Sequence, residues 1–236
     1  MAASRRANGN TESVDNYLKA ILYLGGPEED RVTIKALAER LSVAPASVTN
    51  MLQKLAVSPV PLVQYERHRG VQLSASGRRR ALEVLRHHRL IETFLYEVLD
   101  YPIDEVHEEA ERLEHFISER FEERIAAKLG HPKTDPHGHS IPTLEGEMPE
   151  EQRSARESIL LADVVESGTF TIESVSDRNP RNLLLIEACG IAPGARLRIR
   201  KTPSQKGYSV SVGRSSRVFD ISRKVAQDVR IVRLPE

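Results

Sequence analysis

Hydrophobic residues recur every three or four positions in the first part of the chain, within three short segments. This spacing predicts helices over residues 14–24, 33–43 and 46–57. Thr33 stands where a helix N-cap is preferred. Because only a short turn separates the second and third segments, they predict a helix-turn-helix.

The hydrophobic pattern then changes to short alternating runs. Residues 62–65 and 71–73 read as two strands around the sequence ERHRG, whose glycine suits a hairpin turn. A basic two-stranded hairpin directly after a helix-turn-helix predicts a winged helix.

Longer periodic segments follow, over residues 74–99 and 103–130, and the second segment ends at Gly130, a natural helix cap. Five short alternating runs near the C-terminus predict a small β-barrel. The expected fold is therefore α+β and multidomain. The predicted parts are a winged helix with a disordered N-terminal arm, a helical domain, a linker and a β domain, at residues 1–75, 76–142, 143–157 and 158–236.

Charge is distributed unevenly, although the net charge is zero. Residues 1–90 carry 14 Lys and Arg against 8 Asp and Glu, whereas residues 91–130 carry 4 against 12. A basic first part suggests a polyanionic partner and an acidic middle suggests a cationic one. A single cysteine and the lack of a signal peptide or membrane-spanning run indicate a cytoplasmic protein.

The segment VHEEAERLEH, residues 106–115, collects acidic and imidazole side chains. On a helix, His107, Glu111, Glu114 and His115 lie within an arc of roughly 100°. His88 and Glu92, four residues apart, share a face of the preceding helix. Such a face is either solvated or a metal site. Carboxylates and imidazoles without a thiolate suit Mn²⁺ and Fe²⁺, with Zn²⁺ able to compete.

The order of these motifs resembles the diphtheria toxin repressor family of iron- and manganese-dependent regulators. The resemblance runs from about residue 12 to residue 142, through PLVQYERHRGVQLSASG, HRLIETFL, VHEEAERLEH and PHGHSIP. The β-rich tail resembles the SH3-like third domain of the longer members. The resemblance therefore implies a helical metal-binding and dimerisation domain between a winged helix and an SH3-like β-barrel.

Metal ligands are implied by the same resemblance. The ancillary site of the family corresponds to His88, Glu92 and His107. The primary site corresponds to Asn16, Glu111, Glu114 and His115.

Two of the matched positions bear on the choice of metal. A glutamate at position 111, where iron-type members have cysteine, is a manganese-type feature. Lys19 replaces a glutamate that helps the short manganese-type members hold a two-metal cluster, which favours two separate sites. Asn179 and Asn182 fall near the segment that reaches the ancillary metal in longer members.

The expected function is a homodimeric regulator that binds palindromic operator DNA when activated by Mn²⁺, with Fe²⁺ possible, and controls metal homeostasis genes. The helix over residues 46–56 is expected in the major groove. Base and phosphate contacts are assigned to its N-terminal residues Ala46, Ser47, Thr49 and Asn50. Backbone contacts are assigned to the wing residues Arg67, His68 and Arg69.

Two alternatives remain open from the sequence. One is a winged-helix regulator that senses an organic ligand, with a merely solvated acidic helix. The other is a helical metalloenzyme. Such bundles use Glu-x-x-His on paired helices, whereas here ERLEH gives Glu-x-x-Glu-His once, with no second copy. His137 and His139 are interpreted as structural parts of a loop.

Overall fold

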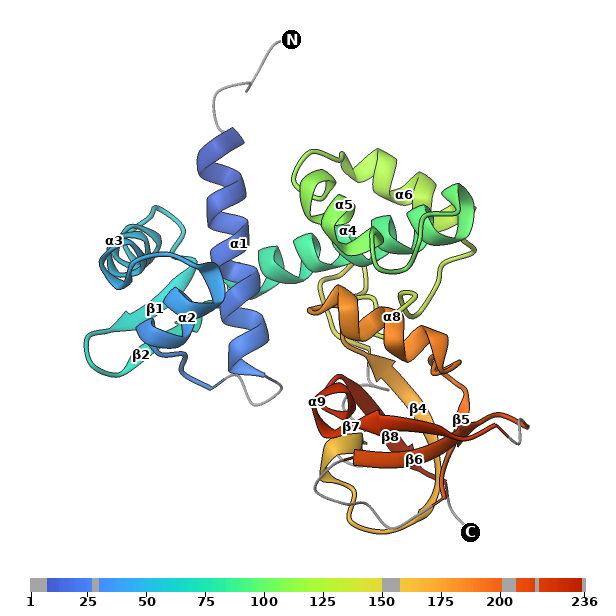
Figure 1. Cartoon of the computed structure of the whole chain (residues 1–236). Coiled ribbons are helices and arrows are strands. Elements are labelled where there is room, and N and C mark those ends of the chain that lie inside the picture. The colour runs from blue at the N-terminus through green and yellow to red at the C-terminus, as the bar shows by residue number, and fades with distance from the viewer. Residues whose placement is uncertain (1–7, 27–29, 150–157, 201–206, 215–216, 235–236) are drawn as a thin grey trace. The chain divides into compact units, whose positions relative to one another are not determined.

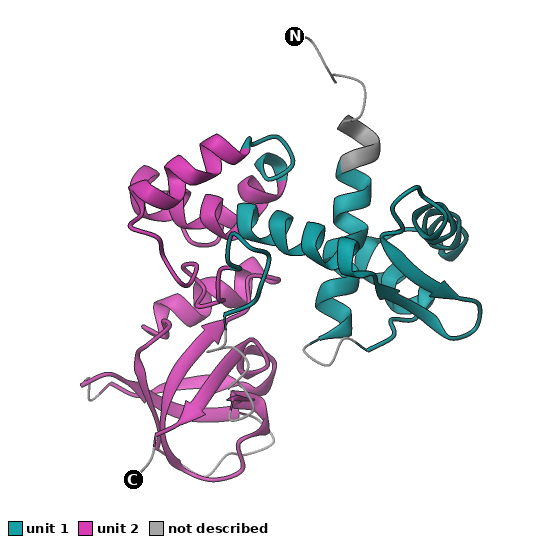
Figure 2. Ribbon diagram, turned by 180° about the vertical axis from the view of Figure 1, so that it is seen from behind, with its two compact units in different colours: residues 1–88, 112–118, 142–149 teal, residues 89–111, 119–141, 150–236 magenta. Residues whose placement is uncertain are grey.

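The computed structural model describes residues 8–26, 30–149, 158–200, 207–214 and 217–234. Two compact units divide the chain, and each is described by itself (Figure 2). Unit 1 contains residues 1–88, 112–118 and 142–149, and unit 2 contains residues 89–111, 119–141 and 150–236. The four-part domain division expected from the sequence stays a prediction.

Unit 1 contains the winged helix (Figure 1). Its helices and strands are α1 (Asn8–Gly25), α2 (Ile34–Leu41), α3 (Pro45–Ala56), β1 (Val63–Glu66), β2 (Gly70–Leu73) and the first half of α4 (Ala75–Leu99). Thr33 caps α2 as expected, since its side chain accepts a hydrogen bond from the amide of Ala36. The buried faces of α1, α2 and α3 meet the hairpin in one core, which includes Leu18, Leu37 and Leu52.

Helix α1 begins at Asn8, six residues before the predicted start. Residues 8–10 therefore belong to a helix, and that part of the expected disordered arm is wrong. Residues 1–7 lie outside the described residues.

The wing depends on a glycine. Strands β1 and β2 pair antiparallel, with Val63 opposite Leu73 and Glu66 opposite Gly70. Gly70 has φ 93°, and a β-carbon there would lie 2.5 Å from the carbonyl oxygen of Val32. Only glycine allows this close approach of two backbones.

A second glycine fixes α4 against the hairpin. A β-carbon on Gly77 would lie 1.9 Å from the carbonyl oxygen of Leu62, which already accepts a hydrogen bond from the amide of Ser74. We expect Gly77→Ala to destabilise unit 1 by about 1–3 kcal/mol or more, because backbone must move to admit the methyl group. Chemical denaturation measures the change, and an unaltered unfolding midpoint would contradict this packing.

The long helix predicted over residues 103–130 is wrong, because the structure has two shorter helices there. Helix α5 (Val106–Leu113) and helix α6 (Glu119–Lys128) are separated by residues 114–118. Ser118 stands directly before α6, at a position where serine favours a helix start. Gly130 follows α6 with φ 72°, the left-handed conformation expected of a terminating glycine.

The β domain lies in unit 2 and forms a six-stranded sheet in the order β3-β8-β4-β5-β6-β7. Its elements are β3 (Ser158–Leu160), the 3₁₀ helix η2 (Leu161–Asp163), β4 (Gly168–Val175), α8 (Pro180–Ala188), β5 (Arg196–Ile199), β6 (Gly207–Val212), β7 (Phe219–Ser222), α9 (Arg223–Ala226) and β8 (Val229–Arg233). The sequence analysis did not predict α8, which starts with Asn179 as N-cap and Pro180 in its first turn. In the part of the chain that the structure describes, no helix is long and apolar enough to cross a membrane.

Candidate metal centre

One group of charged side chains is buried inside unit 1, where α1 meets residues 112–118. Glu114 is 1% exposed, and its carboxylate lies against Lys19, His88 and His115. The Lys19 ammonium donates to both of its oxygens, at 2.6 and 2.9 Å, and His88 Nδ1 lies 2.6 Å from Oε2. We call Asp15, Lys19, His88, Glu114 and His115 the first cluster.

His115 has the features of a metal ligand in this cluster. Its Nε2 lies 3.2 Å from Glu114 Oε1 and its Nδ1 lies 3.4 Å from Asp15 Oδ2. Both nitrogens are buried and, among the described residues, neither has a hydrogen-bond partner. A buried polar atom without a partner is costly, so this histidine fits a role in ligation.

Asp15 of the first cluster and its neighbour Asn16 on α1 carry oxygen atoms that fit a divalent cation. Asp15 offers Oδ2, while its Oδ1 accepts a 2.6 Å hydrogen bond from Arg80 Nε. The amide oxygen of Asn16 is buried without a hydrogen-bond partner in the described chain. Carboxylate, amide and imidazole donors without a thiolate favour hard or borderline ions such as Mn²⁺ and Fe²⁺.

A second cluster lies within unit 2 and comprises Glu92, His107, His137 and Asp177. His107 Nδ1 is 3.1 Å from Glu92 Oε1 and 3.3 Å from Asp177 Oδ2. Glu92, His107 and Asp177 each offer a ligand atom within 4.8 Å of the others. Charge on His107 and His139 holds the pKa of Asp177 below its usual range, although burial, the largest influence, acts in the opposite direction.

His137 joins this cluster from the loop that follows α6. Its side chain is fully buried, its Nδ1 lies 3.9 Å from Glu92 Oε2, and neither ring nitrogen has a hydrogen-bond partner among the described residues. The loop is fastened to β4, since the carbonyl of His137 accepts from the amide of Val175 at 2.9 Å. A β-carbon on Gly138 would lie 2.3 Å from the carbonyl oxygen of Glu173, so the loop requires this glycine.

The same loop carries a small network beside the second cluster. Asp135 Oδ1 accepts hydrogen bonds of 2.9 Å from the amides of His137 and His139. Its Oδ2 lies 3.5 Å from Arg89 Nε and 3.3 Å from His139 Nδ1. Burial lowers the pKa of His139, but the Asp135 carboxylate outweighs burial and raises the pKa above its usual value.

The assignment of each predicted ligand to a metal site stays a prediction. His88, assigned to the ancillary set, contacts Glu114 in the first cluster. Glu111 lies on α5 in unit 2, and its role as a ligand stays a prediction. Asn179 caps α8, and the side-chain Nδ2 of Asn182 donates to Asp228 Oδ2 at 2.6 Å. The β domain reaches the second cluster through Asp177 instead.

Sequence reasoning missed Asp15, His137 and Asp177. Asp15 precedes Asn16 on α1, and the sequence PHGHS drew attention to His137 without showing that it is buried. Asp177 is a single acidic residue between β4 and α8. The sequence contains no signal for its contact with His107.

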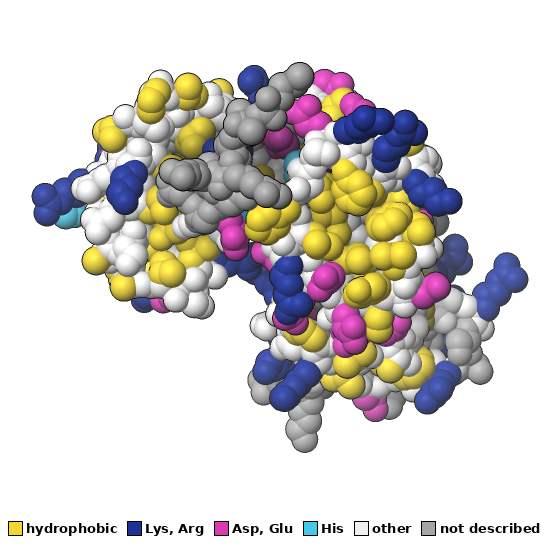
Figure 3. Space-filling view, turned by 90° about the horizontal axis from the view of Figure 1, so that it is seen from above, with side chains coloured by type: hydrophobic (Ala, Val, Ile, Leu, Met, Phe, Trp, Pro, Cys, Tyr) yellow, Lys and Arg dark blue, Asp and Glu magenta, His cyan; other side chains and the backbone are white. Residues whose placement is uncertain are grey.

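The predicted DNA-contacting residues lie on the surface of unit 1. On α3, Ala46, Ser47 and Asn50 are exposed, and the Thr49 hydroxyl, half-buried, donates to the carbonyl of Pro45. At the wing, Arg67, His68 and Arg69 are exposed. Figure 3 shows basic side chains projecting together with a histidine at one edge of the molecule.

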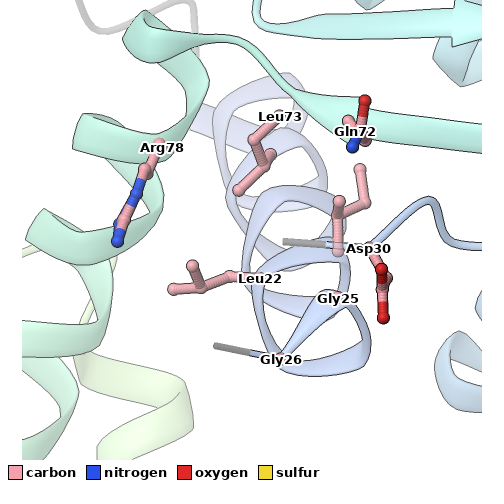
Figure 4. A pocket seen from close by; sticks show the side chains of 8 residues that line it. Leu22, Gly25, Gly26, Asp30, Gln72, Leu73 and Arg78 are labelled. Carbon is pink, nitrogen blue, oxygen red and sulfur yellow. The ribbon is translucent and has the colours of Figure 1, made fainter. Parts of the chain in front are cut away.

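Unit 1 also contains a pocket, and its lining residues differ from the candidate ligands (Figure 4). None of the predicted metal or DNA-contacting residues lines this pocket. Its lining includes Leu22, Gly25, Asp30, Leu73 and Arg78.

Family models match three consecutive parts of the chain. Residues 10–71 match the N-terminal DNA-binding domain of iron-dependent repressors, and residues 74–143 match their metal-binding and dimerisation domain. Residues 159–233 match the FeoA domain.

Comparisons with individual proteins also find repressors. The iron-dependent repressor IdeR of Mycobacterium tuberculosis (strain ATCC 25618 / H37Rv) is 31% identical over 205 residues, which covers 83% of this chain and 87% of that protein. The diphtheria toxin repressor of Corynebacterium diphtheriae is 32% identical over 136 residues, which covers 57% of this chain and 58% of that protein.

Solved structures are also similar. A manganese-dependent transcriptional repressor in complex with manganese is 37% identical, with a TM-score of 0.82, and the match covers 94% of this chain and 100% of that one. ScaR with bound Zn²⁺ is 31% identical, with a TM-score of 0.74, over 94% of this chain and 99% of that one. The chain therefore belongs to the diphtheria toxin repressor family of metal-dependent, DNA-binding transcriptional repressors, which act as dimers and are not enzymes.

Proposed function

We propose that this repressor is activated by Mn²⁺ bound at the first cluster. The observation that carries the proposal is His115, a buried imidazole between Asp15 and Glu114 whose two nitrogens have no hydrogen-bond partner in the described chain. The carboxylates of Asp15 and Glu114 and the imidazole of His115 suit Mn²⁺, as does a glutamate at position 111. One of the similar solved structures is a manganese-dependent repressor with manganese.

The ligands divide between two segments that are distant in sequence. Asp15 and Asn16 belong to α1, which packs in the core of the winged helix, and Glu114 and His115 belong to residues 112–118. Asp15, Asn16, Glu114 and His115 would hold the ion, which would supply a divalent charge to the two segments. With that charge in place, Asp15 and Glu114 would hold α1 at one position relative to residues 112–118, which would favour the DNA-binding state of the winged helix.

The second cluster is proposed as an ancillary metal site. Glu92 and His107 come from the helices, His137 from the loop after α6 and Asp177 from the β domain. An ion there would fasten the β domain to the helical part of unit 2. We therefore assign this cluster a supporting role, with a smaller effect on DNA binding than the first cluster.

DNA recognition is proposed for α3 and the wing. The exposed N-terminal residues of α3 enter the major groove, where Asn50 and Thr49 can hydrogen-bond to base edges or phosphates. Arg67, His68 and Arg69 at the wing approach the phosphate backbone. Arg69 also lies 3.1 Å from Glu66, so Arg67 has more freedom to contact DNA.

Arg67 provides a test of the phosphate contact. We expect Arg67→Ala to weaken binding to operator and random DNA alike, and to reduce the slope of log affinity against log salt by about one. Asn50→Ala serves as the matched comparison, with a cost of roughly 1–3 kcal/mol on the operator and little on random DNA. An Arg67→Ala protein with an unchanged salt slope would contradict the phosphate contact.

The dimer surface is proposed on the helical part of unit 2. Tyr96 and Leu99 on α4 and Phe121 on α6 are large hydrophobic residues with 41%, 50% and 50% of their surface exposed. Exposed apolar groups of this size mark interaction surfaces, which agrees with a homodimer.

The choice of metal is tested by a series of divalent ions. Operator DNA is selected from a random palindromic library with the Mn²⁺-loaded protein. Fluorescence anisotropy then measures its binding with Mn²⁺, Co²⁺, Ni²⁺, Zn²⁺ and, without oxygen, Fe²⁺. We expect Mn²⁺ to activate DNA binding at the free Mn²⁺ concentrations that a protein meets in the cell. A protein activated by Fe²⁺ but not by Mn²⁺ would overturn the proposal.

A further inference from the structure

We propose that Lys19 is a built-in competitor of the metal ion, which holds Glu114 in the metal-free protein and thereby raises the metal concentration needed for activation. This inference rests on the proposed function, because it concerns the same cluster. Lys19 acts as a residue that sets the affinity of the cluster and is not itself a ligand.

The contacts of Lys19 occupy the ligand atoms of Glu114. Its ammonium lies 2.6 Å from Oε1 and 2.9 Å from Oε2, and the side chains are 7% and 0% exposed. An ammonium group donates hydrogen bonds and has no lone pair to offer a metal. An incoming ion therefore competes with Lys19 for the lone pairs of the Glu114 oxygens.

The cluster is already balanced in charge without a metal. Its carboxylates, Asp15 and Glu114, are each paired with a cation, since Arg80 Nε lies 2.6 Å from Asp15 and Lys19 contacts Glu114. Paired buried carboxylates are much less costly than unpaired ones. The pairing stabilises the metal-free protein, and a divalent ion then brings two more positive charges near two cations.

The affinity for metal is consequently lower than the same donors would give with a neutral side chain at position 19. In the metal-free protein the ammonium pairs α1 with Glu114, an arrangement that differs from the one that the ion would impose. Metal binding then exchanges one cation for another at Glu114.

The test replaces Lys19 with methionine, which keeps much of the length and removes the charge. The background variant is His107→Ala, chosen to disable the second cluster so that bound Mn²⁺ reports on the first. Electron paramagnetic resonance of free Mn²⁺ measures the affinity of the full chain. We expect Lys19→Met to bind Mn²⁺ at least tenfold more tightly, and its metal-free form to melt at a lower temperature.

Lys35→Met is the matched control, because Lys35 is an exposed lysine that pairs with Glu39 at 3.8 Å on α2. It should leave both the Mn²⁺ affinity and the melting temperature unchanged. If metal-free Lys19→Met does not fold, Lys19→Arg is used instead. Because Lys19→Arg keeps the positive charge, it should bind Mn²⁺ as weakly as the parent protein. Tenfold tighter binding of Mn²⁺ by Lys19→Arg would overturn the proposal.

Two results separate this inference from the proposed function. A folded Lys19→Met protein with equal or weaker Mn²⁺ affinity overturns the role of Lys19 and leaves the metal site intact. A parent protein that binds no Mn²⁺ at all overturns the proposed function itself.

Discussion

His115→Ala is expected to abolish Mn²⁺-activated operator binding, because it removes the buried imidazole between Asp15 and Glu114. Both ring nitrogens of His115 have no hydrogen-bond partner in the described chain, so the metal-free fold depends little on them. We therefore expect a loss of at least a hundredfold in operator affinity at saturating Mn²⁺, with little change in the melting temperature of the metal-free protein. Fluorescence anisotropy and circular dichroism measure the two effects.

His87→Ala is a suitable control for this substitution. His87 is also a buried histidine of unit 1, and its Nδ1 lies 3.3 Å from the carbonyl oxygen of Glu114 and not from a carboxylate. It should lower stability without removing a ligand, so activation by Mn²⁺ should persist. Equal losses of activation in the two variants would show that His115 acts only through packing.

His107→Ala is expected to weaken activation without abolishing it, by roughly tenfold in operator affinity, the lower end of the range for altered metal coordination. The residue links Glu92 and Asp177 in the second cluster, at 3.1 and 3.3 Å. Because charge on His107 helps to hold the pKa of Asp177 down, the substitution should raise that pKa toward its usual value. Nuclear magnetic resonance of the Asp177 carboxyl carbon checks this shift.

His88→Ala tests to which of the two clusters His88 belongs. Its contact with Glu114 at 2.6 Å places it in the first cluster, so the variant should follow His115→Ala more closely than His107→Ala. Identical responses of His107→Ala and His115→Ala to Mn²⁺ would contradict two clusters of unequal importance.

Much of the winged helix was predictable, because its signals are local. Helical spacing, the Thr33 cap and Gly70 in the hairpin turn each depend on residues a few positions apart. The break between α5 and α6 was not predictable from spacing, because the residues on both sides keep helical periodicity. Helix α8 was missed because its capping signal, Asn179 before Pro180, lies inside a region of alternating strands.

The candidate sites were predictable only in part, because their partners are distant in sequence. The run that contains Glu114 and His115 carries a visible cluster of carboxylates and imidazoles. The contacts of Asp15 with His115 and of Asp177 with His107 join residues 100 and 70 positions apart along the chain. Such contacts arise from tertiary packing and have no counterpart in the spacing of residues.

The most direct test of the central claim is the operator affinity of the unaltered chain, measured by anisotropy with chelated metal and with saturating Mn²⁺. If Mn²⁺ at the first cluster selects the DNA-binding state, affinity for the selected operator should rise by at least a hundredfold with Mn²⁺. Affinity for random DNA should change little by comparison. Equal operator affinity with and without Mn²⁺ would contradict the account.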